Sequence, residues 1–93
     1  PSIVIMSEGN YSDAHYFPWA YRELGIGKLV GMPVLGTATS VWWETLQDPS
    51  LYFGIPEVGI KNRRGEYLEN QQLEPDFRVN DDPESVAAGE DKQ

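Results

Sequence analysis

The sequence contains no cysteine and a single histidine, His15, among its 93 residues. The absence of cysteine excludes a disulfide framework, a thiolate nucleophile and a cysteine-ligated zinc site, although it leaves the redox compartment open. One histidine among scattered acidic residues also lacks the ligand spacing of a metal centre, such as a histidine pair one helical turn apart. We therefore expect neither a metal ion nor a cofactor.

Basic residues and long apolar runs are also scarce. The 7 Lys and Arg residues stand against 15 Asp and Glu residues, and the formal net charge is −8. This charge repels phosphate backbones and anionic lipid headgroups, so nucleic acid and membrane surfaces are not expected as partners. No apolar run approaches the roughly 20 residues that span a bilayer. The composition, 40% hydrophobic and 12% aromatic, instead predicts one folded unit with a modest core.

The first third of the chain has the pattern of a strand, a helix and a second strand. Residues 3–6 form an apolar run rich in β-branched residues, which predicts a fully buried, central strand. From residue 12 to residue 24, apolar residues recur at three- and four-residue intervals, which predicts a helix. Pro18 lies inside it and predicts a kink, or a later start of the regular part. With residues 28–31 as a second strand, this order predicts a parallel crossover and an α/β layer.

The second half of the chain is predicted to be mostly β. Its strong β propensity and its turn residues predict strands at residues 40–45, 51–55, 58–61 and 66–68, with a hairpin turn at residues 62–65. Two adjacent tryptophans, Trp42 and Trp43, lie in the first of these strands. Neighbouring strand residues point to opposite faces, so only one ring can occupy a one-sided core and the other can line a groove. The structural interpretation, which we expect, is that both rings pack in half-buried sites.

Chemistry is most naturally placed at the junction between the first strand and the helix. Ser12 stands where the helix begins, beside backbone N–H groups that have no partner within the helix and at the positive end of its dipole. A serine that attacks a carbonyl needs a base and preorganised donors for the developing negative charge, and the N–H groups of Ser12 and Asp13 are candidate donors. The structural alternative is an ordinary N-cap, because serine is among the favoured N-cap residues.

Two other polar residues carry weaker signals. His15 lies three residues after Ser12, but side chains with this spacing project around the first helical turn, and no acid is placed to orient the ring. We therefore do not assign His15 as the base. Glu69 lies just beyond the last predicted strand, where composition alone predicts a solvated surface carboxylate.

An ordered set of segments resembles the nucleophile region of the tricorn-core and tail-specific serine peptidases. In that family a strand delivers Asn-Glu or a similar pair, a serine opens a helix, and the helix ends in a Leu-Gly-x-Gly-Lys turn before a strand that ends in glycine. The matching segments here are Ile3–Glu8, Ser12-Asp13-Ala14, Phe17 and Arg22–Gly31. Several ordered segments at matching intervals are more specific than Ser-Asp-Ala alone.

The resemblance extends downstream over nearly the whole chain. Leu68-Glu69-Asn70 and Leu73–Val79 resemble the stretch with the family's catalytic glutamate and the Pro-Asp strand after it, and Ala88–Gln93 resembles the lead-in to its terminal helix. The sequence departs from the family at residues 32–40, where tricorn-like members tend to have Thr-Arg-Thr-Trp-Gly-Gly and this chain has Met-Pro-Val-Leu-Gly-Thr. Substrate preference therefore does not transfer, although Leu35 is a candidate for an apolar pocket wall.

The resemblance implies a role for each of three residues. Ser12 corresponds to the acylated nucleophile, the backbone N–H of Asp13 to one oxyanion donor, and Glu69 to the acid that helps orient the catalytic histidine through an intervening serine. The family's histidine, that serine and a second, glycine-derived oxyanion donor come from upstream segments, and nothing in this sequence fills their positions. The chain starts at Pro1 and enters an apolar run almost at once, which we interpret as a start inside a longer protein. We expect the isolated chain to be inactive.

The fold that the resemblance implies is α/β, part of a ClpP/crotonase-like spiral that is incomplete on its own. Residues 1–79 would form the C-terminal part of a serine peptidase catalytic domain. Residues 80–93 would form a polar tail with one short helix, for which Asp82 and Pro83 are the expected N-cap and first position. Missing upstream strands would leave strand edges exposed, which predicts a homo-oligomer. The resemblance favours an extracytoplasmic setting, the bacterial periplasm, over the cytoplasm.

The sequence thus leaves different classes of function open. The first is a serine endopeptidase that cleaves peptides or unfolded proteins through an acyl-enzyme on Ser12, with a histidine base from an upstream segment. The alternative is a non-catalytic peptide-binding module or degenerate peptidase fragment, which would hold an extended peptide by strand addition beside Trp42 and Trp43. A third is a small acidic structural domain unrelated to peptidases.

Overall fold

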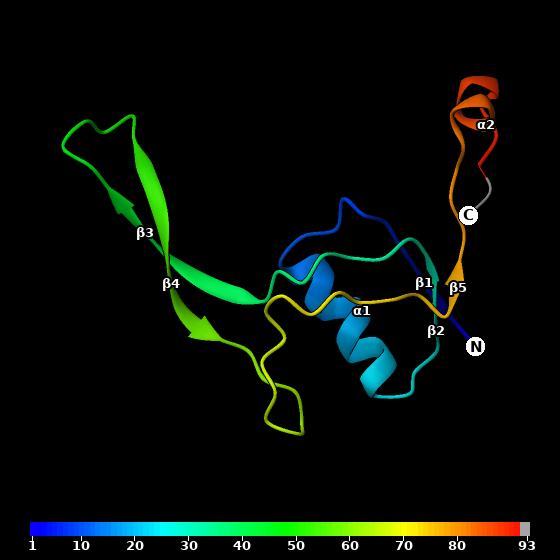
Figure 1. Cartoon of the computed structure of the whole chain (residues 1–93), viewed down its shortest axis with the longest axis horizontal. Coiled ribbons are helices and arrows are strands. Elements are labelled where there is room, and N and C mark those ends of the chain that lie inside the picture. The colour runs from blue at the N-terminus through cyan, green and yellow to red at the C-terminus, as the bar shows by residue number, and fades with distance from the viewer. Residues whose placement is uncertain (92–93) are drawn as a thin grey trace.

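The computed structural model describes residues 1–91; the last two residues of the predicted tail, 92–93, lie outside the described residues. Figure 1 shows a small α/β body, a β-hairpin arm that projects from it and a short helix near the C-terminus. The elements in chain order are β1 (Ile3–Met6), α1 (Asp13–Glu23), β2 (Lys28–Gly31), β3 (Thr39–Thr45), β4 (Tyr52–Gly59), β5 (Phe77–Arg78) and α2 (Pro83–Ala88).

The body is built on a three-stranded parallel sheet with the order β1-β2-β5. The predicted parallel crossover from β1 through α1 to β2 is therefore confirmed, with Ile3 opposite Lys28 and Met6 opposite Gly31. The prediction that residues 3–6 form a fully buried central strand is wrong. β1 is an outer strand, and Ile3 and Ile5 are 57% and 53% exposed, because α1 covers only the face that carries Val4 and Met6.

Helix α1 runs without interruption from Asp13 to Glu23 although Pro18 lies inside it. Proline has no N–H to donate, so the carbonyl four residues earlier, that of Ala14, loses its helical partner. The side chain of Asn10 replaces it, because its Nδ2 donates to the Ala14 carbonyl at 3.1 Å. Pro18 itself is buried, so the residue that weakens the helix also contributes to its packing.

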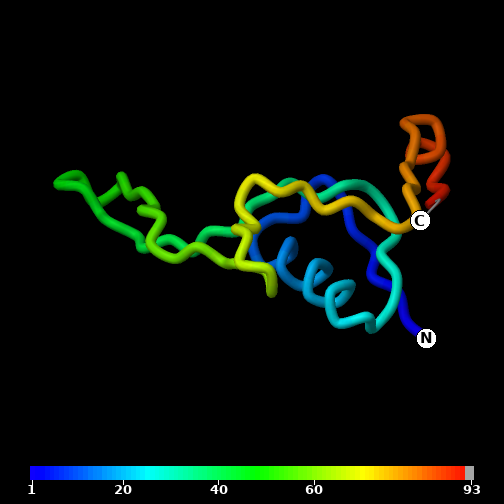
Figure 2. The backbone as a smooth tube through the Cα atoms, turned by 60° about the horizontal axis from the view of Figure 1, so that its bottom comes forward, coloured from blue at the N-terminus to red at the C-terminus, as the bar shows by residue number. Residues whose placement is uncertain are grey.

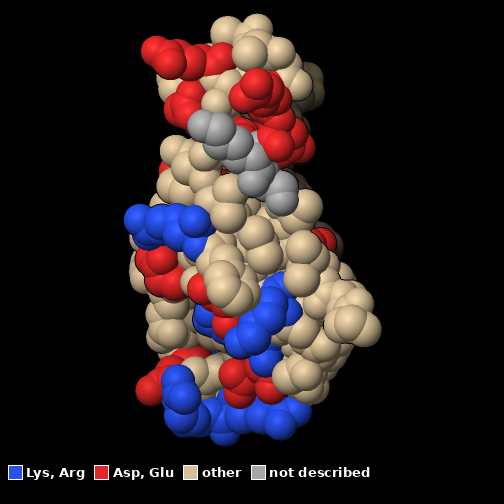
Figure 3. Space-filling view, turned by 90° about the vertical axis from the view of Figure 1, so that its right-hand side faces the viewer, with Lys and Arg blue, Asp and Glu red and all other residues tan. Residues whose placement is uncertain are grey.

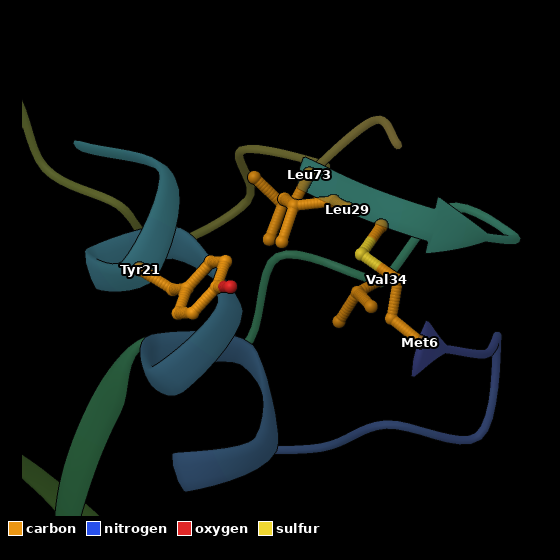
Figure 4. Packing of buried hydrophobic residues seen from close by; sticks show 5 residues of the cluster. All are labelled: Met6, Tyr21, Leu29, Val34 and Leu73. Atoms are coloured by element: carbon orange, nitrogen blue, oxygen red, sulfur yellow. The ribbon is translucent and has the colours of Figure 1, made fainter. Parts of the chain in front are cut away.

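A compact apolar cluster joins the helix to the sheet. It consists of Met6, Tyr21, Leu29, Val34 and Leu73, with Val4 and Trp19 packed against it. Figure 4 shows Tyr21 reaching from α1 toward the strand residues, and its hydroxyl lies 2.6 Å from the hydroxyl of Ser2. The cluster thus fixes the position of α1, and with it the residues that open the helix.

The arm is a two-stranded antiparallel sheet of β3 and β4, which Figure 2 shows extending away from the body. Residues 51–55 and 58–61 were predicted as separate strands, but residues 52–59 form one strand. The ladder accommodates Pro56 because it lies next to an irregularity between Ser40 and Val41, where the missing N–H is tolerated.

Both tryptophans of the arm are exposed, Trp42 at 60% and Trp43 at 61%. The expectation that both rings pack in half-buried sites is therefore wrong, because within residues 1–91 no element packs against either face of the hairpin. Trp43 makes one aromatic contact, an edge-on arrangement with Tyr52 at a centroid distance of 5.5 Å.

The chain returns from the arm through the predicted turn at residues 62–65, which is closed by hydrogen bonds from Asn62 N–H to the Glu66 carbonyl and from Gly65 N–H to the Asn62 carbonyl. Residues 66–68 are not a strand, as only an isolated bridge joins Tyr67 to Lys61. Asp76 then fixes the start of β5, because its carboxylate accepts the Leu29 N–H at 2.8 Å while its own N–H donates to the Leu29 carbonyl.

Helix α2 begins at Pro83 with Asp82 as its N-cap, as predicted, and the Asp82 carboxylate accepts the Ser85 N–H at 2.8 Å. Figure 3 shows acidic side chains gathered at the end of the molecule that carries α2, whereas the basic side chains lie on the body below. Neither helix of the described residues is long and apolar enough to cross a membrane.

Candidate active site

The segment between β1 and α1 presents Ser12 in an unusual backbone conformation. Asn10 closes the preceding turn, as its N–H donates to the Ser7 carbonyl at 3.0 Å and its side chain holds the first turn of α1. Ser12 has φ 54° and ψ −114°, a region that residues with a side chain rarely adopt. Holding a residue there costs about 1–3 kcal/mol, and such strain concentrates at functional sites. A serine on a sharp, strained turn from strand to helix is also the geometry that exposes a nucleophilic hydroxyl.

The hydroxyl of Ser12 does not cap the helix. Ser12 occupies the N-cap position, as the structural alternative predicts, but its side chain makes no capping hydrogen bond. Its backbone N–H donates instead to Thr37 Oγ1 at 3.0 Å, across 25 residues of sequence. Ser12 is half-buried, and its Oγ has no hydrogen-bond partner among the described residues.

The next backbone N–H, that of Asp13, has no acceptor within residues 1–91. The following N–H groups are engaged, because His15 and Tyr16 both donate to the Ser12 carbonyl. Asp13 therefore offers a free donor at the positive end of α1, adjacent to the Ser12 hydroxyl. Of the two candidate oxyanion donors in the sequence, only this one is unoccupied.

Glu69 is not the solvated carboxylate that composition alone predicts. Its Oε2 accepts the Ala38 N–H at 2.6 Å and the Thr39 hydroxyl at 2.7 Å. These two hydrogen bonds, together with attraction to His15, hold the pKa of Glu69 below its usual range, against the opposing effect of burial. The other oxygen, Oε1, accepts no hydrogen bond from the residues that the structure describes. Glu69 is thus an ionised, anchored carboxylate with one oxygen available.

The loop of residues 34–39 connects Ser12 to Glu69. Thr37 contacts Ser12, and the next two residues contact Glu69, so three consecutive residues join the two sites. The loop is fixed by a pair of hydrogen bonds between Val34 and Leu73.

The approach of this loop to the Glu69 segment depends on Gly36. Its carbonyl accepts the Asn70 N–H at 2.7 Å, and a Cβ at Gly36 would collide with the backbone of Gln71. Asn70, with φ 61°, is the other non-glycine residue of the described chain with positive φ, a conformation that asparagine tolerates better than most. Both strained residues thus lie at the candidate site.

His15 lies beside the site, but within residues 1–91 its ring makes no hydrogen bond to the Ser12 hydroxyl. Its side chain is 1% exposed, and its Nδ1 lies 3.3 Å from the Thr37 carbonyl, which makes Nδ1 the donor. The sequence pattern assigns no role to His15 or to Thr37. No local pattern distinguishes Thr37, because its contacts depend on a loop that folds back onto the helix.

A cavity of about 440 Å³ opens at the carboxyl ends of the parallel strands, and it is lined by Glu8, Met32, Pro33, Leu35, Gln72 and Arg78. This is the edge of an α/β sheet at which ligands commonly bind. Leu35, the candidate for an apolar pocket wall, is among its lining residues. Within residues 1–91 no group of three or more His, Asp or Glu side chains is arranged to hold a metal ion.

Comparisons with known proteins identify relatives of this chain. A family model for peptidase family S41 matches residues 1–79. This chain is similar to part of the crystal structure of the tricorn protease, with 26% sequence identity and a TM-score of 0.86. The match covers 98% of this chain and 9% of the tricorn protease chain. The crystal structure of mature CPAF is 19% identical with a TM-score of 0.72, covering 82% of this chain and 15% of that one, which is a likeness of fold. A comparison with curated proteins gave no significant match.

Proposed function

The chain belongs to peptidase family S41, a family of serine peptidases, and we propose that it supplies the nucleophile and the orienting acid of a serine endopeptidase. It spans 9% of the tricorn protease chain and 15% of the CPAF chain, so the proposal concerns an intact protein of which these residues form one part. The proposed substrates are peptides and unfolded proteins.

The observation that carries the proposal is the conformation of Ser12. In this strained turn the hydroxyl makes no capping hydrogen bond, and Oγ has no hydrogen-bond partner among residues 1–91. In the proposed reaction Oγ attacks the substrate carbonyl carbon while a histidine base removes its proton, forming a tetrahedral intermediate. Its collapse breaks the C–N bond, the histidine returns the proton to the leaving amine, and water then hydrolyses the acyl-enzyme. A residue in this position gains nothing from such strain if it serves only to start a helix.

The N–H of Asp13 is the proposed oxyanion donor. It is adjacent to the nucleophile and has no acceptor among residues 1–91, whereas the Ser12 N–H is already bound to Thr37. A free donor at a helix N-terminus stabilises negative charge as it develops on the carbonyl oxygen. A second donor, a glycine N–H, would come from another segment of the intact protein.

Glu69 is the proposed acid that orients the catalytic histidine through an intervening serine. Hydrogen bonds from Ala38 and Thr39 fix one carboxylate oxygen and keep the group ionised, while Oε1 is left to accept the hydroxyl of that serine. The histidine and the serine would both come from outside this chain. His15 is not proposed as the base, because its ring makes no hydrogen bond to the Ser12 hydroxyl within residues 1–91.

The proposed setting of these residues is a catalytic domain with the ClpP/crotonase-like spiral fold, of which residues 1–79 form the C-terminal part. Apolar residues on the uncovered face of the parallel sheet support further covering layers: Ile3, Ile5 and Phe77 are each more than half exposed. β1 and β5 are outer strands, and β3 and β4 each have one free edge, so association of copies through strand edges is part of the proposal.

A non-catalytic peptide-binding module is the second candidate, favoured by one observation. Trp42 and Trp43 are both about 60% exposed on a hairpin with free edges, where an extended peptide can add a strand and pack against the rings. This candidate predicts peptide binding that depends on Trp43 and not on Ser12.

Peptide cleavage by the intact protein separates the two candidates. We expect Ser12→Ala to abolish turnover while peptide binding persists, because the hydroxyl alone makes the covalent bond. Ser50→Ala, at the tip of the arm, is the matched control and should retain full turnover. Turnover that survives in Ser12→Ala refutes the proposal. Binding without turnover in the wild type, lost in Trp43→Ala, supports the peptide-binding module.

A further inference from the structure

The strained backbone of Ser12 is enclosed by a ring of hydrogen bonds that involves two residues without an assigned role. The Ser12 N–H donates to Thr37 Oγ1 at 3.0 Å, and His15 Nδ1 contacts the Thr37 carbonyl at 3.3 Å. The ring closes through the backbone, because the His15 N–H donates to the Ser12 carbonyl at 2.7 Å. Both backbone groups of Ser12, its N–H and its carbonyl, therefore belong to the ring.

Thr37 is suited to this task by its side chain and its anchoring. A β-branched side chain has restricted χ1 freedom, so its hydroxyl forms a fixed acceptor. The loop around it is held at several points: Thr37 N–H donates to the Leu35 carbonyl, and Glu69 binds the two residues that follow. A shift of Thr37 would therefore disturb both the nucleophile and the acid.

His15 provides the second anchor. Burial of a polar ring is unfavourable unless it forms hydrogen bonds, and this ring is 1% exposed with its Nδ1 at the Thr37 carbonyl. An apolar residue would fill the same space but leave that carbonyl without this partner. The His15 imidazole is therefore placed to hold the loop of residues 34–39 rather than only to pack.

We propose that Thr37 and His15 are positioning residues for the nucleophile. By binding the Ser12 N–H and the loop that contacts it, they keep Oγ and the Asp13 N–H directed toward the substrate. This inference rests on the proposed function, because it assigns the ring a role in the reaction of Ser12. Loss of the ring would lower the rate of the chemical step through a less favourable geometry, while substrate binding would change little.

The test compares Thr37→Val, which keeps the shape but removes the acceptor, with Thr37→Ser, which retains a hydroxyl. In the intact protein we expect Thr37→Val to lower kcat roughly tenfold with KM unchanged, the equivalent of one lost hydrogen bond. Thr37→Ser should restore most of the rate. Thr45→Val, at the exposed end of β3, is the control and should leave kcat unaltered. His15→Leu should also lower kcat, and His15→Asn, whose amide can replace the Nδ1 donor, should recover part of it.

A second readout does not depend on catalysis. In the 93-residue chain, amide hydrogen exchange at Ser12 should be at least tenfold faster in Thr37→Val than in the wild type, while exchange at Leu29 in the core is unchanged. If Thr37→Val shows the faster exchange but the intact wild-type protein shows no turnover, the proposed function is refuted and the ring of hydrogen bonds around Ser12 is still supported. The positioning role is overturned if Thr37→Val keeps the wild-type kcat, if Thr37→Ser fails to recover the rate, or if Ser12 exchange does not change.

Discussion

Replacement of Glu69 by glutamine tests the link between the acid and the loop. The carboxylate accepts two hydrogen bonds on one oxygen, at 2.6 Å from Ala38 N and 2.7 Å from Thr39 Oγ1. Hydrogen bonds to a charged group contribute about 1.5–3 kcal/mol, against about 0.5–1.5 for neutral pairs, so two bonds would lose about 2 kcal/mol. Glu69 is partly exposed, and screening by water reduces the expected loss to about 1 kcal/mol for Glu69→Gln.

The lowered pKa of Glu69 determines how the stability loss in Glu69→Gln depends on pH. The pKa of Glu69 is lower in the folded chain than its ordinary value, so the folded state favours the carboxylate. Its contribution to stability is therefore present above the unfolded pKa, about 4.3, and is lost as the pH falls through the folded pKa. Urea unfolding of the wild type and of Glu69→Gln, at pH 7 and at acidic pH, measures the difference between their unfolding free energies. It should be about 1 kcal/mol at pH 7 and shrink toward zero in acid. A difference that is absent at pH 7, or that does not change in acid, would show that the Glu69 carboxylate does not stabilise the fold.

Three further predictions concern Gly36, Leu73 and the isolated chain. Gly36→Ala places a Cβ against the Gln71 backbone and should displace the loop of residues 34–39 from Glu69. We expect the free energy of unfolding in urea to fall by at least about 1 kcal/mol and the NMR chemical shift of the Ala38 amide to change. An unchanged Ala38 shift would contradict this. Leu73→Ala removes a side chain that is 2% exposed and should destabilise the chain by about 2–5 kcal/mol in the same assay, whereas Leu46→Ala at the exposed tip should cost less than 1 kcal/mol. The purified 93-residue chain should show no Ser12-dependent peptide cleavage by mass spectrometry, because no base is hydrogen-bonded to the Ser12 hydroxyl within residues 1–91; cleavage that is lost in Ser12→Ala would contradict this.

Local patterns predicted the strand, helix and strand of the body because they depend on neighbours in the sequence. The hydrophobic spacing of α1 and the capping pair Asp82-Pro83 gave the correct elements. The environment of β1 was not predictable in this way. An apolar run indicates that a strand can be buried, but whether both faces are covered depends on the layers that pack against it.

Strand β4 of the arm is a second feature that the local sequence does not predict. Residues 51–55 and 58–61 were predicted as two strands, yet one strand runs through Pro56 because a ladder irregularity lies beside it. Whether Pro56 meets such an irregularity depends on the register with β3, which the local sequence of β4 does not contain.

The candidate site combines predictable and unpredictable parts. Ser12 and Asp13 were identified from the strand-to-helix junction and the family resemblance, and the structure adds the strained backbone and the free Asp13 N–H. Glu69 was singled out by resemblance alone, since its contacts span about 30 residues of sequence. Thr37 was missed for the same reason.

Labelling by a fluorophosphonate probe shows whether the Ser12 hydroxyl is an activated nucleophile. The intact protein is incubated with the probe and digested, and the modified peptide is mapped by mass spectrometry beside Ser12→Ala and Ser50→Ala controls. We expect modification at Ser12 that is lost in Ser12→Ala and retained in Ser50→Ala. The assignment of Ser12 as the nucleophile would be contradicted if the folded intact protein is not modified at Ser12. It would also be contradicted if Ser12→Ala takes up as much probe as the wild type.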